Sequence, residues 1–187
     1  MKKIGFFGGS FNPPTIAHFE IVNSAIKEFN LDEIVIVPMG DKYQKEGLID
    51  FKHRYNMLKL LFKNTPKARV SNLQENQTKI SYAIDTFNII DKKYENDERF
   101  FIMGFDNFSK INTWKDSEKL LNNRKYIVFA REEFNINNMD ANQVKVLNVN
   151  KNISSSILRK KIETEEDIKN LTTSSVIKYI EQNGLYK

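Results

Sequence analysis

Short apolar runs alternate along the chain with longer segments whose apolar residues recur at helical spacing. The run at residues 2–7 leads into residues 15–30, where apolar side chains fall three or four positions apart. Residues 33–38 form a β-branched run stopped by proline, which is typical of a buried parallel strand. The pattern therefore predicts strands and helices in alternation.

The same reading covers the rest of the chain, with a polar loop at 39–50 and an Asn-rich loop before the last strand. Further strands are expected at 68–72, 99–104, 125–131 and 144–149, and helices at 51–63, 81–94, 116–122, 154–162 and 174–184. Parallel strands need crossovers, which are usually helices, so we predict an α/β fold with a doubly wound, Rossmann-like parallel sheet. Without a repeat or linker, residues 1–187 are expected to form a single domain whose helical C-terminal part begins at about 153.

Ligands of such sheets bind at the carboxyl ends of the strands, near the switch in strand order. Three polar or glycine-bearing turns are expected there: "GGSFNPPT", "PMGDK" and "GFDNF". The pocket is therefore predicted where these turns meet.

Composition narrows the class of protein. The chain has 187 residues, no cysteine and only two histidines, which excludes a disulfide framework and a Cys-based zinc site. No apolar run is long enough for a membrane span, and no signal-peptide core develops, so we expect a cytoplasmic protein without a membrane partner. The net charge of +5 is dispersed and no arginine-rich arm is present, which favours nucleotides over nucleic acid as the anionic partner.

The segment after the first strand has the properties of an anion site. Gly8 and Gly9 allow close backbone approach, and Thr15 can cap the helix that follows. Neither of the two familiar glycine-rich nucleotide loops is present. Thr15 and His18 lie three positions apart and so share a helix face turned toward the loop. The alternative is a half-buried structural histidine.

A second segment, "ISSSILRKKI" at 153–162, places three serines at a helix start and Arg159 one turn later. Side-chain and backbone donors of this kind converge on phosphate oxygens. The alternative is a serine-rich cap followed by basic surface residues. We expect the imidazole of His18 and the guanidinium of Arg159 to meet at one phosphate-sized hollow.

These two segments resemble the Thr/His-x-Gly-His and Ile-Ser-Ser-Thr-x-x-Arg elements of the nucleotidyltransferase superfamily. Within it the chain is most similar to bacterial nicotinate-nucleotide adenylyltransferases, through "SYAIDT", "FIMGFDNF" followed by "TW", and the ending "GLYK". The resemblance implies transfer of the adenylyl group of ATP to nicotinate mononucleotide in NAD biosynthesis, giving nicotinate adenine dinucleotide and pyrophosphate.

The resemblance also implies a set of site residues. The catalytic residues would be His18, Thr15, Lys42 and Arg159. ATP would be bound by Gly8, Gly9, Ser10, Phe11, His18, Gly104, Asp106, Ile153, Ser154, Ser155, Ser156 and Arg159. The acceptor would be bound by Lys45, Thr86, Trp114 and Arg131, with Trp114 stacking on the pyridine ring. An ordinary packing aromatic at 114 and a surface ion pair at 131 are the alternatives.

Some positions depart from the family pattern. Asn12 stands where Asp is usual, Ala17 where Gly is usual, and Thr15 where many members have His. The loop at 39–50 lacks the common Pro-Pro-His-Lys and offers only Lys42 and Lys45 as comparable cations. A different adenylyl- or cytidylyltransferase acting on another phosphorylated acceptor, or a catalytically silent nucleotide-binding regulator, therefore remain alternatives.

The expected chemistry follows from the charges. A mononucleotide phosphate is largely ionised at neutral pH and needs no general base. Positioning and electrostatic donors should carry most of the rate effect, with Mg²⁺ arriving on ATP. The sequence leaves a homo-oligomer open.

Overall fold

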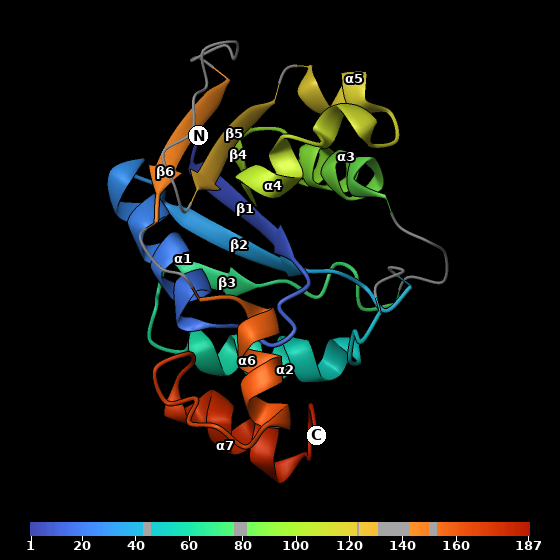
Figure 1. The fold of residues 1–187 in the computed structure, drawn as a ribbon. Helices are drawn as coiled ribbons and strands as arrows, with labels where there is room; N and C mark the ends of the chain where they lie inside the picture. The colour runs from blue at the N-terminus through green and yellow to red at the C-terminus, as the bar shows by residue number, and fades with distance from the viewer. Residues whose placement is uncertain (43–45, 77–81, 123, 131–142, 150–152) are drawn as a thin grey trace.

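A six-stranded parallel sheet with helices on both faces forms the centre of the molecule (Figure 1). The computed structural model describes residues 1–42, 46–76, 82–122, 124–130, 143–149 and 153–187. The strand order is β3-β2-β1-β4-β5-β6, and every neighbouring pair is parallel. The predicted doubly wound sheet is confirmed.

The element boundaries follow the apolar pattern closely. The strands are β1 (Lys3–Gly9), β2 (Glu33–Pro38), β3 (Ala68–Val70), β4 (Glu98–Gly104), β5 (Lys125–Ala130) and β6 (Val144–Asn148). The helices are α1 (Ile16–Glu28), α2 (Phe51–Leu61), α3 (Ala83–Lys93), α4 (Phe105–Phe108), η1 (Ile111–Thr113), α5 (Ser117–Leu121), α6 (Ser155–Glu163) and α7 (Ser174–Gln182). Only α4 and η1 were not predicted, because each is about one turn long and too short to show a helical period.

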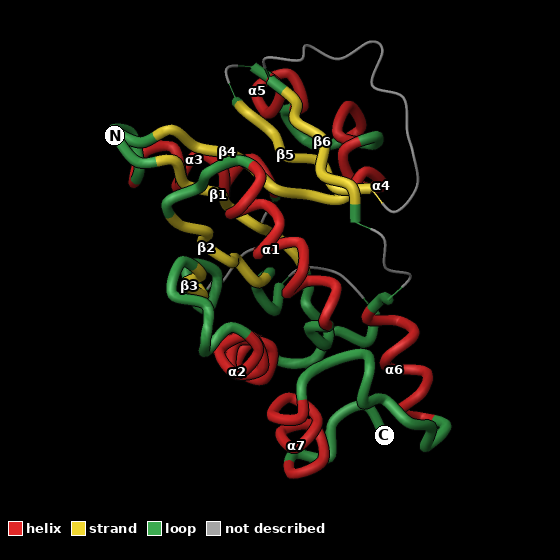
Figure 2. Tube along the Cα trace, turned by 90° about the vertical axis from the view of Figure 1, so that its left-hand side faces the viewer, coloured by secondary structure: helices red, strands yellow, loops and turns green. Residues whose placement is uncertain are grey.

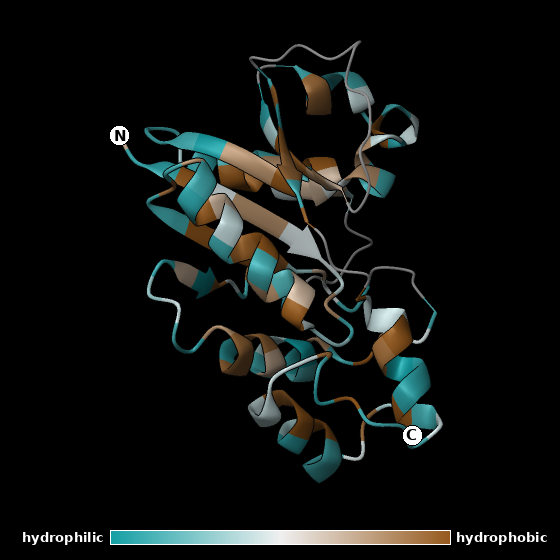
Figure 3. Cartoon of the chain, turned by 60° about the vertical axis from the view of Figure 1, so that its left-hand side comes forward, coloured by the Kyte–Doolittle hydropathy of each residue, from teal (hydrophilic) through white to brown (hydrophobic). Residues whose placement is uncertain are grey.

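The sheet separates two apolar clusters, one on each face. Successive strand residues point to opposite sides, so Phe6 packs into one cluster and Phe7 into the other. The cluster around Phe7 is covered by α1, α2 and α7, and the cluster around Phe6 by α3, α4, η1 and α5. Figure 3 shows hydrophobic colour along the central strands and hydrophilic colour on much of α1. None of the helices in the described part of the chain is long and apolar enough to cross a membrane.

The order of strands reverses between β1 and β4, which pair side by side at the middle of the sheet. Their carboxyl ends, at Gly9 and Gly104, lie at this switch point. Helix α7 packs beside α2, and α6 contacts the loop that follows β1 (Figures 1 and 2). The fold therefore brings the first and last parts of the chain together at the switch point.

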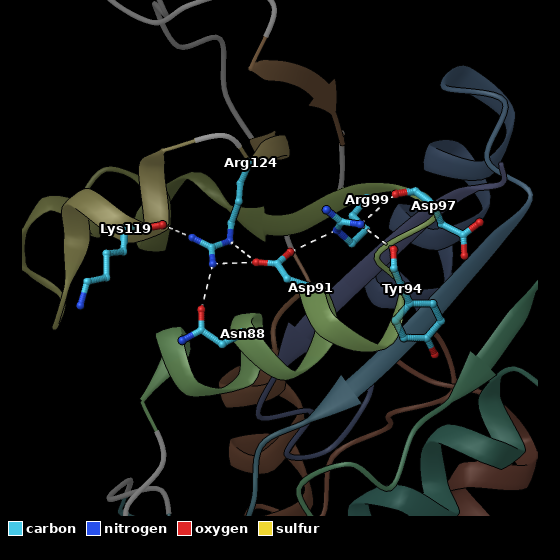
Figure 4. A network of polar contacts seen from close by, with 7 residues as sticks. All are labelled: Asn88, Asp91, Tyr94, Asp97, Arg99, Lys119 and Arg124. Carbon is cyan, nitrogen blue, oxygen red and sulfur yellow. Dashed lines mark hydrogen bonds and ion pairs between the residues drawn. The ribbon is translucent and has the colours of Figure 1, made fainter.

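A polar network fixes α3 to the opposite, amino end of the sheet (Figure 4). The Asp91 carboxylate on α3 lies 3.1 Å from Nε of Arg99 and 2.7 Å from Nη2 of Arg124. Arg124 also donates to Oδ1 of Asn88, and Arg99 to the carbonyl of Tyr94. Because the other end of α3 carries Thr86, this network helps to set the position of one wall of the candidate site.

Candidate active site

A cavity opens at the switch point, with an empty volume of about 600 Å³ that includes its open mouth. Apolar side chains from β1, β2 and β4 form much of its wall. The lining also includes two glycines and four side chains with polar groups: Gly8, Gly9, Gln74, Thr86, Asn107 and Trp114. The indole of Trp114 gives the cavity a flat aromatic surface. A concave, mostly apolar cavity with few convergent polar groups is typical of a small-molecule site.

The two glycines after β1 serve different purposes. A Cβ placed on Gly8 would meet no atom within 4 Å, so this backbone faces the open cavity. A Cβ on Gly9 would come within 3.0 Å of the Phe11 ring. Phe11 itself is buried, with its ring 5.2 Å from that of Phe7 and 5.1 Å from that of His18. The side chain of Phe11 thus belongs to the core, which leaves only its backbone for the predicted ATP contact.

Thr15 and His18 are joined at the start of α1. The backbone N–H of Thr15 donates to Nδ1 of His18 at 2.9 Å, and Oγ1 of Thr15 lies 2.9 Å from the same nitrogen. A backbone N–H can only donate, so Nδ1 is an acceptor and the neutral imidazole carries its proton on Nε2. The helix start therefore sets the tautomer and the orientation of the ring.

The C-terminal serine and arginine segment reaches residues 8–15, which comprise the end of β1 and the loop before α1 and which we call the phosphate loop. Nη1 of Arg159 donates to the carbonyl of Asn12 at 2.7 Å, and Oγ of Ser155 donates to the carbonyl of Pro13 at 2.8 Å. Nη2 of Arg159 lies 3.4 Å from Oγ of Ser156. The two segments singled out from the sequence are therefore in direct contact.

Residues close to the end of the sequence hold the same loop. The hydroxyl of Thr172 donates to the carbonyl of Pro14 at 3.0 Å, and Ile16 N–H donates to the carbonyl of Leu171 at 2.9 Å. The hydroxyl of Tyr186 donates to Oδ1 of Asn12 at 2.8 Å, and burial raises the pKa of this phenol. The path of the phosphate loop is thus set by contacts with α6, α7 and their connections.

On the other side of the cavity, Thr86 is held by a buried glutamine. Nε2 of Gln74 lies 2.5 Å from Oγ1 of Thr86, while Oε1 of Gln74 accepts from Gly40 N–H at 2.8 Å. Gln74 was not predicted as a site residue, since a lone polar side chain in a turn gives no sequence signal. It joins the segment after β2 to the wall that carries Thr86.

The remaining predicted residues in the described part of the chain do not belong to the lining of the cavity. Gly104 is the N-cap of α4, and a Cβ there would lie 3.2 Å from the Phe129 ring, while Asp106 is exposed in the first turn of that helix. Ser154 caps α6 by accepting from Ile157 N–H, and Ile153 is half-buried just before it. The half-exposed Ser10 accepts at its carbonyl from Arg54.

Three of the predicted site residues are cations of the loop at 39–50 and of the segment after β5. Lys42 is exposed beside Asp41. Lys45 and Arg131 lie outside the described residues.

Sequence reasoning missed Arg54 on α2, which has no exposed side-chain surface. Its guanidinium contacts the phosphate loop and both ends of the loop at 39–50. Its neighbour His53 instead contacts the hydroxyl of Tyr179 on α7 at 3.1 Å. Nothing in the letters "FKHRYNML" distinguishes a buried arginine from one on a solvated helix face.

Comparison with known proteins identifies the family. The model of the cytidylyltransferase-like family matches residues 6–161. A probable nicotinate-nucleotide adenylyltransferase of Fusobacterium nucleatum is 35% identical over 96% of this chain and 97% of that protein. The nicotinate-nucleotide adenylyltransferase of Bacillus subtilis is 32% identical over 100% of both chains. This chain belongs to the nicotinate-nucleotide adenylyltransferase family.

The fold of this nicotinate-nucleotide adenylyltransferase family member agrees with solved structures. The Plasmodium falciparum nicotinic acid mononucleotide adenylyltransferase complexed with NaAD superimposes with a TM-score of 0.84 and 26% identity, covering 100% of this chain and 98% of that chain. The resemblance drawn from the two sequence segments is thus confirmed.

Proposed function

We propose that the protein transfers the adenylyl group of ATP to nicotinate mononucleotide, releasing pyrophosphate and nicotinate adenine dinucleotide. The observation that carries the proposal is the contact of the phosphate loop with Ser155 and Arg159 beside a cavity lined by Gly8, Thr86 and Trp114. This arrangement puts an anion-binding loop next to a site for a flat ring. Nucleotidyl transfer between two phosphorylated substrates requires both.

The ATP side is formed by the phosphate loop and the helix starts around it. Gly8 provides open backbone, and the N-terminus of α1 supplies partial positive charge for phosphate oxygens. Nε2–H of His18 is assigned to an α-phosphate oxygen or the bridging oxygen, because its Nδ1 is occupied by Thr15. Arg159 and the serines at the start of α6 are assigned to the β- and γ-phosphates, and Gly104 and Asp106 to the adenosine.

The acceptor side is assigned to the cavity wall around Thr86 and Trp114. The pyridine ring would stack on the Trp114 indole, which already forms part of the wall. Lys42 is exposed at the end of the segment after β2, where it can approach a phosphate oxygen. Lys45 and Arg131 remain proposals from the family resemblance.

The reaction needs no covalent enzyme intermediate. An ionised oxygen of the acceptor phosphate attacks the α-phosphorus of ATP, the bond to the bridging oxygen breaks, and pyrophosphate leaves with that oxygen. Mg²⁺ would enter with ATP, held by the triphosphate oxygens, and would neutralise part of their charge. Within the described residues no cluster of three or more His, Cys, Asp or Glu side chains could hold a metal ion.

Pyrophosphate release over a panel of triphosphates and acceptors tests the proposal. We expect release with ATP and nicotinate mononucleotide, and little with CTP or with pantetheine phosphate. Preference for another acceptor would assign a different transferase activity. ATP binding without any pyrophosphate release would indicate a silent nucleotide-binding regulator.

A further inference from the structure

Arg54 is the one fully buried charged side chain in the described part of the chain, and the reaction described above does not use it. Its Nε donates to the carbonyl of Ile49 at 2.8 Å, Nη1 to the carbonyl of Ser10 at 3.1 Å, and Nη2 to the Asp41 carboxylate at 2.9 Å. The Phe51 ring lies 5.6 Å from the guanidinium carbon. All three hydrogen-bond partners belong to loops beside the site.

A buried guanidinium is expensive unless its donors are satisfied, and burial lowers the pKa of Arg54. A methionine or leucine could fill the same volume without that penalty. An apolar side chain could not, however, hydrogen-bond to three oxygen atoms from two loops, as the planar guanidinium does. The geometry of Arg54 is thus suited to fixing loop positions rather than to stabilising α2.

A second contact joins the same two loops. Nδ2 of Asn12 donates to the carbonyl of Gly47 at 2.7 Å, and Oδ1 of Asn12 accepts from the Tyr186 hydroxyl. The carbonyl of Gly47 cannot donate, so the amide orientation of Asn12 is determined by its surroundings. The phosphate loop is therefore tied to residues 39–50, which we call the lysine loop, at two separated points.

Between these points the chain carries Lys42, directly after Asp41. We propose that Arg54 is a positioning residue: by joining Ser10 of the phosphate loop to Asp41 and Ile49 of the lysine loop, it places Lys42 next to the bound phosphates. The role of Lys42 rests on the proposed function. The tie itself rests only on the observed contacts.

The Asp41→Asn substitution distinguishes a positioning role of Arg54 from a purely electrostatic role, because the two roles predict opposite changes in ATP binding. Removing a carboxylate beside an anion site raises the local positive potential, so Coulomb's law alone predicts equal or tighter ATP binding. Positioning predicts the opposite, because the charge-assisted bond to Arg54 becomes a weaker neutral one. Asp41 is half-exposed, with 48% of its side chain accessible, so the variant is expected to fold.

The measurement that tests this is kcat/KM of the full chain with ATP and nicotinate mononucleotide. Asp41→Asn should lower it about ten-fold, since small misplacements of catalytic groups have large effects on rate. Asp50→Asn is the matched control: it removes the same charge from the same loop, close to Arg54, but Asp50 makes no ion pair with Arg54. It should stay within about two-fold.

A double-mutant cycle tests whether the effect passes through Lys42. In a Lys42→Ala background, Asp41→Asn should change kcat/KM by no more than about two-fold, because the side chain to be placed is gone. An equal loss in both backgrounds overturns the proposal, and so does unchanged or increased activity of Asp41→Asn alone. Arg54→Lys, which keeps the charge without the planar fork, should reproduce the loss if it folds.

Amide hydrogen exchange of the ligand-free protein tests, independently of turnover, whether Arg54 ties the phosphate loop to the lysine loop. Exchange over residues 46–50 should be faster in Asp41→Asn than in Asp50→Asn. Equal exchange overturns the tie. Wild-type protein that releases no pyrophosphate with any acceptor would instead overturn the proposed function, and the exchange comparison would still test Arg54.

Discussion

Nη1 of Arg159 donates to the backbone carbonyl of Asn12 at 2.7 Å, across 147 positions of sequence. The contact joins the middle of α6 to the phosphate loop, so the guanidinium is anchored beside this loop before any nucleotide binds. Arg159 therefore helps to shape the loop, and in the proposed function it also offers charge to a phosphate. A preorganised cation of this kind needs little rearrangement during reaction.

His18→Ala should lower kcat by about 100-fold or more while the fold remains intact, since a donor to the reacting phosphate is lost. Steady-state pyrophosphate release and a circular dichroism spectrum measure the two effects. His53→Ala is the control, because His53 lies on α2 and its ring contacts the Tyr179 hydroxyl on α7. Near-normal turnover of His18→Ala would remove His18 from the mechanism.

Gly8→Ala should lower activity and leave stability almost unchanged, whereas Gly9→Ala should lower stability. The new methyl at Gly8 meets open space, so stability should change by no more than about 0.5 kcal/mol while kcat/KM falls. At Gly9 it would press on the Phe11 ring 3.0 Å away, and overpacking should destabilise the fold by about 1–3 kcal/mol. Denaturant titrations and kinetics on both variants check this, and a reversed pattern would mean that the cavity does not face Gly8.

Trp114 is the only tryptophan of the chain, so its fluorescence reports directly on the cavity. Titration with nicotinate mononucleotide should change the emission if the pyridine ring stacks on the indole as proposed. Trp114→Phe should weaken acceptor binding less than Trp114→Ala, for which we expect about a ten-fold rise in KM. Emission that responds to ATP but not to the mononucleotide would place the acceptor elsewhere.

Asp91→Asn should lower the free energy of unfolding by about 1–3 kcal/mol, since two partly buried guanidinium groups lose their shared carboxylate. Urea denaturation measures the loss. Glu166→Gln is the matched control: its ion pair with Lys161 is largely exposed and screened by solvent, so the free energy of unfolding should stay close to that of the wild type. Equal stability losses in the two variants would show that the network in Figure 4 stabilises the fold no more than an exposed ion pair does.

Local sequence pattern predicted the strands and the long helices, because runs such as 33–38 can bury themselves only as central strands. It also found the two segments that meet at Arg159 and Asn12, because each carries its own helix-start chemistry. It could not find Arg54 or Gln74, whose roles depend on partners that come from distant loops. The ATP contact of Phe11 stays a prediction for its backbone alone, because its ring fills the space beside Gly9 and Phe7.

The contacts of Thr172 and Tyr186 with the phosphate loop also bear on folding during synthesis. The loop leaves the ribosome before the groups that hold it, which follow their partners by 158 and 174 positions. Strands β1 to β4 can pair earlier, since their own partners are already available. A nascent chain should thus acquire its sheet well before it can grip a nucleotide.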